Sequence, residues 1–250
     1  MGELAIRDLS VTYGRGGAAR TVVKHADLVI PQGKVIGLVG ESGSGKSTVA
    51  RAILGLVKPS GGVVTMDGVN LASLRAAERA RRVQMIFQDP YGSLNPRMTV
   101  GQIVAEALSH RGLRPAERRA EVLRLLELVS MSSEVVPRLP RRLSGGQRQR
   151  VAIARAFAAQ PDVIVADEIT SALDVSVQAQ VLNVLREILA SERHSMLFIS
   201  HNLAVVRYIC DHVAVMQEGV IVEQGDVEQV MGSPQHDYTR ALLAAVPRLV

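Results

Sequence analysis

The stretch KVIGLVGESGSGKSTVARAILGLV, residues 34–57, decides the fold of this chain. Its first seven residues are mostly apolar and predict a buried strand, and its last eleven predict a helix. The segment between them, GESGSGKS (40–47), fits the pattern G-x-x-x-x-G-K-[ST]. We call this segment the P-loop. In a strand-loop-helix setting it predicts a nucleotide site, because backbone N–H groups at a helix N-terminus bind phosphate.

Each residue type in the P-loop suits this chemistry. Gly43 and Gly45 let the backbone curl around phosphate oxygens, and Lys46 reaches the β- and γ-phosphates. The Ser47 hydroxyl is a ligand for Mg²⁺. The alternative is a glycine-rich turn that binds nothing, and the rarity of a chance match weighs against it. The expected nucleotide-binding residues are Gly40, Glu41, Ser42, Gly43, Ser44, Gly45, Lys46, Ser47 and Thr48.

A second chemical signal is VIVADE, residues 163–168, where a predicted buried strand ends in two acids. Open α/β sheets bind their ligands at the carboxyl ends of their strands. We expect Asp167 to join the Mg²⁺ shell through water, and Glu168 to orient and deprotonate an attacking water. An ordinary helix N-cap is the alternative, and the presence of the P-loop favours the catalytic interpretation.

Short β-rich runs alternate with helical runs along the chain, which predicts an α/β fold with a mainly parallel sheet. Turn-bounded β patterns near the N-terminus predict an additional small antiparallel layer. The pattern then becomes almost wholly helical, which predicts an inserted helical subdomain. We expect a single domain, 1–250, with a core at about 1–89 and 160–230, a helical subdomain at about 90–159 and a tail at 231–250.

The composition narrows the class of protein. The net charge is +5, but aromatic residues make up only 3% of the chain, so no base-stacking platform for nucleic acid is expected. The single cysteine, Cys210, has apolar neighbours and is expected to be a buried, unreactive thiol. The N-terminus lacks a signal-like apolar segment, and no apolar run approaches the roughly 18 residues of a spanning helix. We therefore expect an intracellular chain that does not cross a membrane.

A third motif, LSGGQRQR (143–150), precedes an apolar, helix-prone stretch. With the P-loop and VIVADE in this order, the chain resembles the ATP-binding cassette (ABC) family, specifically the nucleotide-binding subunits of transporters, over about residues 3–247. The resemblance implies a P-loop NTPase core, ATP hydrolysis, and ATP and Mg²⁺ as cofactors. Ile169 departs from the family, in which proline commonly follows the Asp-Glu pair, but this change removes no ligand.

The resemblance also assigns residues outside these three motifs. Gln88 in IFQDP resembles the Q-loop glutamine, Asp174 in SALD the D-loop aspartate, and His201 in FISHN the switch histidine. A histidine at this place can hydrogen-bond both the γ-phosphate and the catalytic acid. Tyr13 in VTYG resembles the aromatic residue that stacks on adenine, with ordinary packing as its alternative. The implied catalytic residues are Glu168, His201, Lys46 and Gln88, and the implied metal ligands are Ser47, Gln88 and Asp167.

In this family the P-loop of one subunit and the LSGGQ signature of another close around the same ATP. The resemblance therefore implies a head-to-tail dimer with a second ATP-binding subunit, either identical or homologous. The signature residues that would contact the γ-phosphate are Ser144, Gly145, Gly146 and Gln147. A glycine-rich helix cap without a ligand would explain the glycines but not the companion motifs.

Two further stretches, QDPYGSLNPRMTVG (88–101) and SPQHDYTRALLAAVP (233–247), resemble the oligopeptide, dipeptide and nickel importer subfamily. Asp237 departs from its usual His-Pro-Tyr-Thr tail. The resemblance implies two transmembrane permease subunits, an extracytoplasmic solute-binding protein acting through the permease, no nucleic acid, and a peripheral location at the cytoplasmic face of the inner membrane. Peptides and nickel or metal chelates remain alternative cargoes.

A different class is a soluble ABC ATPase of an enzyme complex or of a DNA-maintenance complex. The DNA-repair members carry coiled coils or zinc-bearing insertions between the P-loop and the signature. Here that interval has no sustained heptads and no cysteine pairs, so the importer is the leading interpretation.

Overall fold

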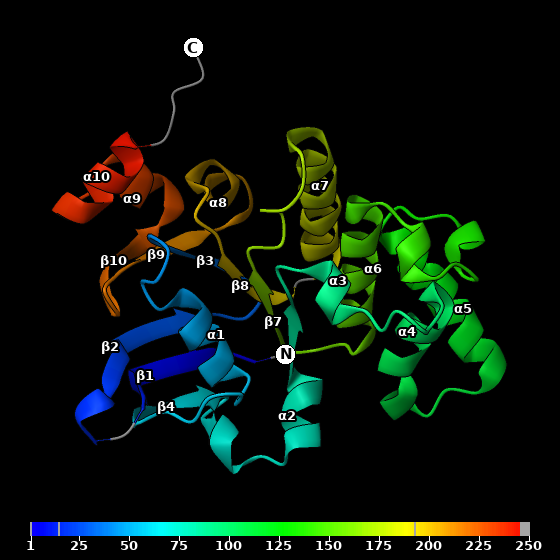
Figure 1. Ribbon diagram of the computed structural model, residues 1–250, viewed down its shortest axis with the longest axis horizontal. Coiled ribbons are helices and arrows are strands. Elements are labelled where there is room, and N and C mark those ends of the chain that lie inside the picture. The colour runs from blue at the N-terminus through cyan, green and yellow to red at the C-terminus, as the bar shows by residue number, and fades with distance from the viewer. Residues whose placement is uncertain (1, 15, 193, 246–250) are drawn as a thin grey trace.

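The computed structural model describes residues 2–14, 16–192 and 194–245 (Figure 1). Its strands are β1 Leu4–Tyr13, β2 Arg20–Ile30, β3 Val35–Val39, β4 Gly61–Met66, β5 Val69–Asn70, β6 Val83–Ile86, β7 Val163–Asp167, β8 Ser195–Ile199, β9 His212–Gln217 and β10 Val220–Asp226. Its α-helices are α1 Lys46–Ile53, α2 Ala76–Arg82, α3 Pro90–Ser93, α4 Val100–Ala107, α5 Pro115–Leu128, α6 Gly145–Ala158, α7 Val175–Glu192, α8 Leu203–Ile209, α9 Val227–Gly232 and α10 Asp237–Ala244.

The larger sheet has six strands in the order β10-β9-β3-β8-β7-β6. The strands from β9 to β6 pair in parallel, and only β10 runs antiparallel to its neighbour. Every residue of β3, β7 and β8 is buried, as their continuous apolar runs predict for strands covered on both faces. The predicted α/β fold with a mainly parallel sheet is confirmed.

The smaller sheet is antiparallel, in the order β2-β1-β4-β5, and it confirms the predicted N-terminal layer. Successive side chains of a strand point to opposite faces of its sheet. On β3, Ile36 and Leu38 therefore join the core shared with the small sheet and α1, whereas Val35 and Val39 join the core shared with the helices. Because its side chains alternate between the two faces, β3 contributes to both hydrophobic cores.

Between β6 and β7, the described residues form only helices and turns. Figure 1 shows α4 and α5 on the side of the molecule away from β1 and β2, with α6 nearer the core. Apolar residues of α4, α5 and α6 share one core cluster with α7 and the larger sheet. The helical content agrees with the predicted region, while the division into subdomains stays a prediction.

Helix α1 ends at Ile53, although the apolar pattern continues to residue 57. Gly55 has a φ of 68°, in the left-handed region that favours glycine. Its N–H donates to the Ala52 carbonyl at 3.0 Å, and the Leu56 N–H donates to the Arg51 carbonyl at 2.8 Å. These two bonds form a Schellman motif, which ends the helix in spite of the apolar pattern.

Two expectations about membranes and thiols can be compared with the structure. Within the part of the chain that the structure describes, no helix combines the length and apolar character needed to span a bilayer. Cys210 is buried, and this burial raises the pKa of its thiol far above the usual range. The expected burial of this cysteine is therefore confirmed, and a thiol with a raised pKa forms little thiolate at neutral pH.

Candidate functional site

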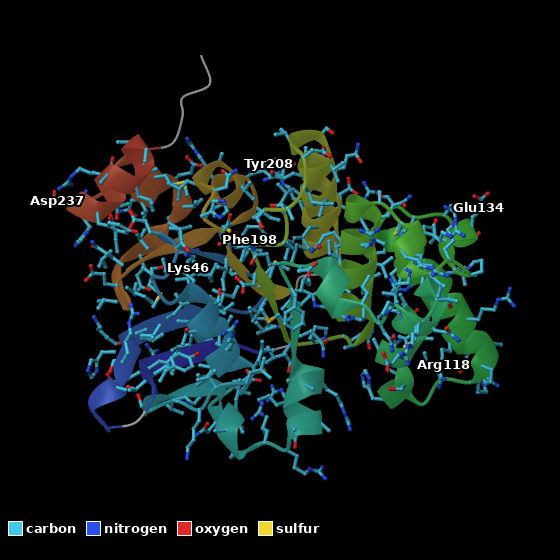
Figure 2. All side chains as sticks on the ribbon, viewed as in Figure 1. Lys46, Arg118, Glu134, Phe198, Tyr208 and Asp237 are labelled. Atoms are coloured by element: carbon cyan, nitrogen blue, oxygen red, sulfur yellow. The ribbon has the colours of Figure 1, made fainter. Side chains whose placement is uncertain are left out.

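Four neighbouring parallel strands, β3, β8, β7 and β6, bring the predicted site residues to one edge of the larger sheet. The P-loop follows β3, His201 follows β8, Glu168 follows β7 and Gln88 follows β6. Because the carboxyl ends of parallel strands meet at the same edge, segments far apart in sequence become neighbours. Lys46, the first residue of α1, lies beside β3, to the left of the centre of the view (Figure 2).

The P-loop backbone needs its glycines. Gly40, Gly43 and Gly45 have φ values of 149°, 84° and 111°. A Cβ on Gly40 would lie 2.1 Å from the Met216 carbonyl oxygen, whereas a Cβ on Gly43 would meet nothing within 4 Å. The loop is thus packed against the end of β9 on one side and open on the other.

Gly40→Ala is expected to lower the free energy of unfolding by about 3 kcal/mol or more, because a backbone clash adds to the cost of a left-handed alanine. Gly43→Ala is the matched control, with an expected cost of about 1–2 kcal/mol from its backbone conformation alone. Urea unfolding followed by circular dichroism measures both variants. Equal losses would show that the contact with Met216 places no demand on position 40.

Lys46 is buried, and its ammonium lies inside the loop. Its Nζ donates to the carbonyl oxygens of Gly40 and Glu41, each at 2.8 Å. Burial lowers the pKa of Lys46, and the carboxylates of Glu168 and Asp167 oppose that shift. A cation is therefore held where phosphate oxygens would contact the loop.

Ser47 and Asp167 form the second part of the site. The Ser47 hydroxyl donates to Asp167 Oδ1 at 3.3 Å. Burial raises the pKa of Asp167, and the hydrogen bond from Ser47 opposes this rise. Mg²⁺ prefers oxygen ligands, and a hydroxyl beside a carboxylate provides such a set.

Glu168 is contacted from two sides. Gln88 Nε2 donates to Glu168 Oε2 at 3.2 Å, and His201 Nδ1 lies 3.3 Å from Glu168 Oε1. The φ of Glu168 is 47°, a left-handed backbone that non-glycine residues rarely adopt. Strained backbones of this kind cluster at active sites, where the rest of the fold holds them in place.

Ser171 has a structural role that the sequence alone does not reveal. Gln88 Nε2 also lies 3.2 Å from Ser171 Oγ, and that hydroxyl donates to the Glu168 carbonyl at 3.0 Å. Ser171 thus links the Gln88 amide to the backbone of Glu168. A short hydroxyl side chain three residues after the acid, where it can reach a backbone carbonyl, was the available signal.

The P-loop, Gln88 and Glu168 surround a cavity of about 300 Å³. Its lining residues are Val22, Ser42, Gly43, Gly45, Lys46, Ser47, Thr48, Gln88 and Glu168. A smaller cavity of about 100 Å³ shares Glu168 and includes His201. The structure therefore brings the P-loop, the Q-loop amide, the acid and the histidine to two adjoining spaces. Tyr13 lines neither cavity. It ends β1 opposite Arg20, with 38% of its surface exposed, and its adenine contact stays a prediction.

The signature segment forms the start of α6, and α6 and α1 lie on opposite sides of β7 in Figure 1. The Ser144 hydroxyl accepts the Gln147 N–H at 3.2 Å, and Gln147 Oε1 accepts the Ser144 N–H at 3.0 Å. This capping box fixes the helix start. A Cβ on Gly146 would lie 2.3 Å from Val177 Cγ1, so the signature packs against α7. None of the four signature residues lines the P-loop cavity.

The D-loop connects the carboxyl edge of the larger sheet with α7. Asp174 Oδ1 accepts hydrogen bonds from the Val177 N–H at 2.9 Å and from the Ser176 hydroxyl at 2.8 Å. The backbone N–H of Val177 and then the Ser176 hydroxyl lower the pKa of this exposed carboxyl. Asp174 therefore caps α7 beside the signature glycines and makes no contact with the P-loop cavity.

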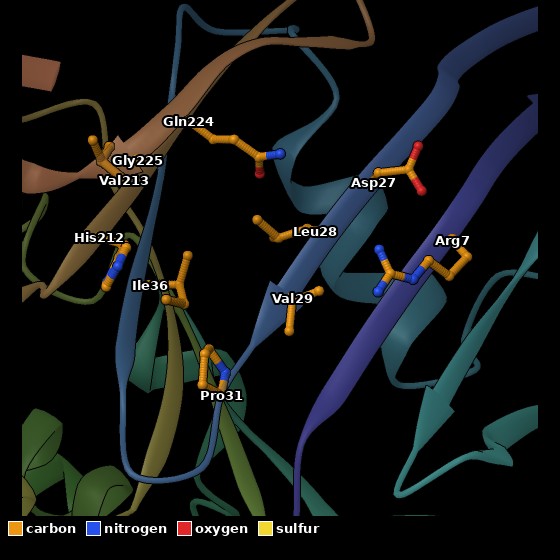
Figure 3. A pocket seen from close by; sticks show the side chains of 10 residues that line it. All are labelled: Arg7, Asp27, Leu28, Val29, Pro31, Ile36, His212, Val213, Gln224 and Gly225. Carbon is orange, nitrogen blue, oxygen red and sulfur yellow. The ribbon is translucent and has the colours of Figure 1, made fainter.

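Another cavity of about 300 Å³ lies at the opposite edge of the larger sheet, near the beginning of β3 and β9 (Figure 3). Its lining includes Arg7, Leu28, Ile36, His212 and Gln224. None of the predicted site residues lines it. The residues predicted to act on ATP therefore lie away from this cavity.

Comparison with known proteins agrees with this geometry. The family model described as ABC transporter matches residues 23–171. The oligopeptide transport ATP-binding protein AmiF of Streptococcus pneumoniae is 47% identical, over 97% of this chain and 80% of the relative. The dipeptide transport ATP-binding protein DppF of Lactococcus lactis is also 47% identical, with the same coverage of both chains.

A solved structure also resembles this chain. It is a dimeric ATP-binding cassette in a post-hydrolysis state, bound to ADP and Pi. It is 28% identical to this chain, with a TM-score of 0.80 over 90% of this chain and 98% of that one. The predicted family and fold are confirmed: the chain belongs to the ABC transporter family and is one of its ATP-hydrolysing cassettes.

Proposed function

We propose that this chain is the subunit that powers a peptide importer by binding and hydrolysing ATP. The observation that carries the proposal is the meeting of Lys46, Ser47, Glu168 and the Gln88 amide around one cavity. Asp167 lies beside this cavity, hydrogen-bonded to the Ser47 hydroxyl. The names of the relatives favour peptides as the cargo class over nickel or metal chelates.

The proposed chemistry follows from the contacts. ATP would place its phosphates on the P-loop N–H groups, with Lys46 at the β- and γ-phosphates. Glu168 would take a proton from the attacking water, while His201 and Gln88 hold its carboxylate in place. Ser47, Asp167 and the amide oxygen of Gln88 fit Mg²⁺ as oxygen donors. Mg²⁺ bound there would neutralise charge on the β- and γ-phosphate oxygens.

The separation of the signature from the P-loop cavity supports a head-to-tail dimer. Ser144 is exposed at the N-terminus of α6 and lies outside its own chain's P-loop cavity. In the proposed dimer, this helix N-terminus meets the γ-phosphate on the partner's P-loop. The second subunit is an identical or homologous cassette, and the similar solved structure is itself dimeric.

We further propose that two transmembrane permease subunits contact the helical region and that an extracytoplasmic solute-binding protein acts through them. This arrangement makes the chain peripheral at the cytoplasmic face of the inner membrane. ATP closure of the dimer would move the permease, and hydrolysis would reset it.

The cargo is tested with the permease reconstituted in vesicles together with this chain and the solute-binding protein of the same transporter. Short peptides loaded on the binding protein are expected to raise ATP turnover, because bound cargo favours dimer closure. A complex carrying Glu168→Gln is the control and is expected to show no stimulation. Stimulation by a nickel chelate but not by any peptide would contradict the peptide assignment.

A further inference from the structure

The C-terminal helix contacts the P-loop through one tyrosine. The Glu41 backbone N–H donates to the Tyr238 hydroxyl at 2.9 Å, between residues that are 197 positions apart in the chain. Tyr238 is the second residue of α10 and belongs to none of the catalytic motifs. It lies far outside the segment that the family model matches. The contact therefore links a peripheral helix to the phosphate-binding loop.

The contact falls on one particular peptide group, the one that joins Gly40 to Glu41. Its N–H faces the Tyr238 hydroxyl, and its C=O accepts the hydrogen bond from Lys46 Nζ at 2.8 Å. A peptide group is planar, so its N–H and C=O turn together. Hydrogen bonds connected in this way also polarise one another. The orientation of this group, set on one side by Tyr238, therefore helps to fix the Lys46 ammonium, together with the Glu41 carbonyl, which accepts a second hydrogen bond from Lys46 Nζ at 2.8 Å.

Tyr238 is itself held firmly by β10. The carboxylate of Glu223 accepts the backbone N–H groups of Gln235 at 2.8 Å and His236 at 3.1 Å. His236 Nδ1 then accepts the Tyr238 N–H at 3.2 Å and caps α10. Desolvation opposes ionisation of Glu223, but the groups around its carboxylate, first among them the Gln235 N–H, together outweigh desolvation and lower its pKa. Glu223 thus stays an ionised acceptor at neutral pH.

Packing adds to these bonds. The Tyr238 ring, with Leu242 and Leu243 of the same helix, packs against the main hydrophobic core. Strand β10 pairs with β9, and β9 pairs with β3, which leads into the P-loop. The hydroxyl and the loop are therefore fixed to the same sheet, and their separation does not depend on a free chain end.

We propose that Tyr238 is a positioning residue for Lys46, acting through the Gly40–Glu41 peptide group. The hydroxyl keeps this peptide in the orientation that presents the Lys46 ammonium to the β- and γ-phosphates of ATP. The inference rests on the proposed role of Lys46 in phosphate binding. It assigns the C-terminal helix a part in nucleotide binding.

Tyr238→Phe tests the proposal, because it removes the hydroxyl and keeps the ring. The Kd for ATP is expected to rise by about three- to tenfold, the range that corresponds to one hydrogen bond, and turnover at ATP concentrations below the new Kd is expected to fall with it. Tyr208→Phe is the matched control. It removes a hydroxyl that donates to Asn183 Oδ1 at 2.6 Å on the outer surface of α8 and α7. The control therefore also loses one tyrosine hydrogen bond, but this bond is not made to the P-loop.

The measurements are ATP binding by calorimetry, phosphate release, and urea unfolding without nucleotide, on wild type and on Tyr238→Phe, Tyr208→Phe, Tyr238→Ala and Lys46→Ala. The proposal is supported if the two phenylalanine variants unfold alike while only Tyr238→Phe weakens ATP binding and turnover. It is overturned if Tyr238→Phe matches Tyr208→Phe in both ATP measurements. It is also overturned if only Tyr238→Ala weakens them, because ring packing then explains the effect. Equal ATP binding by wild type and Lys46→Ala would instead refute the proposed role of Lys46 itself.

Discussion

Glu168→Gln is expected to abolish ATP turnover and leave ATP binding intact. The amide keeps the shape of the side chain and an oxygen that can accept the hydrogen bond from Gln88, but it cannot take a proton from water. Loss of a general base lowers kcat by roughly 10²- to 10⁴-fold. Phosphate release measures the turnover, and equilibrium binding of ATP measures the retained site. With ATP bound and hydrolysis blocked, gel filtration is expected to show the dimer.

The chain provides a close control for this variant. Glu218, in the turn between β9 and β10, also has a φ of 47° but is exposed and lies outside the P-loop cavity. Glu218→Gln makes the same chemical change on the same backbone conformation and is expected to leave turnover near the wild-type value. Undiminished hydrolysis by Glu168→Gln would remove Glu168 from the role of base.

Ser144→Arg is expected to block dimer closure and with it ATP turnover, while each chain still binds ATP. The P-loop cavity contains no signature residue, so the substitution leaves it unchanged. An arginine at the N-terminus of α6 would place a bulky side chain where the γ-phosphate of the opposite subunit must approach. Combined with Glu168→Gln, it is expected to keep the protein at monomer size on gel filtration with ATP.

Ser144 also caps α6, so the loss of a helix cap needs its own control. Thr99 caps α4 with the same kind of capping box, paired with Gln102. Thr99→Arg is expected to cost a similar free energy of unfolding, about 0.5–2 kcal/mol, and to keep the ATPase activity of the isolated protein. Normal turnover by Ser144→Arg would contradict the model of a shared site.

The core of the fold could be predicted because its signals are local. The apolar runs before the P-loop and before Asp167 predict buried strands, and parallel strands must end at a common edge. The proximity of Lys46, Asp167 and Glu168 follows from that geometry alone. Ser171 could not be assigned in the same way, because its contact with Gln88 depends on how two loops fold toward each other.

The β9–β10 hairpin was not predicted. Its second strand, VIVEQGD, has three polar residues among seven, and its register depends on the turn at Glu218 and Gly219, with φ values of 47° and 89°. This hairpin supports the P-loop, since the Gly219 N–H donates to the Ser44 carbonyl at 2.9 Å. The sequence of the tail, residues 233–247, indicates only a transporter class. Its contact with Glu41 arises from tertiary packing that no local pattern encodes.

The left-handed backbone at Glu168 has a consequence for engineering this protein. A side chain in that conformation costs about 1–2 kcal/mol compared with glycine. Glycine at this position would relax the backbone and remove the proposed base in one step. A selection for heat resistance alone would therefore favour variants such as Glu168→Gly, which lack the proposed base. Directed evolution of this chain has to measure ATP turnover together with melting temperature.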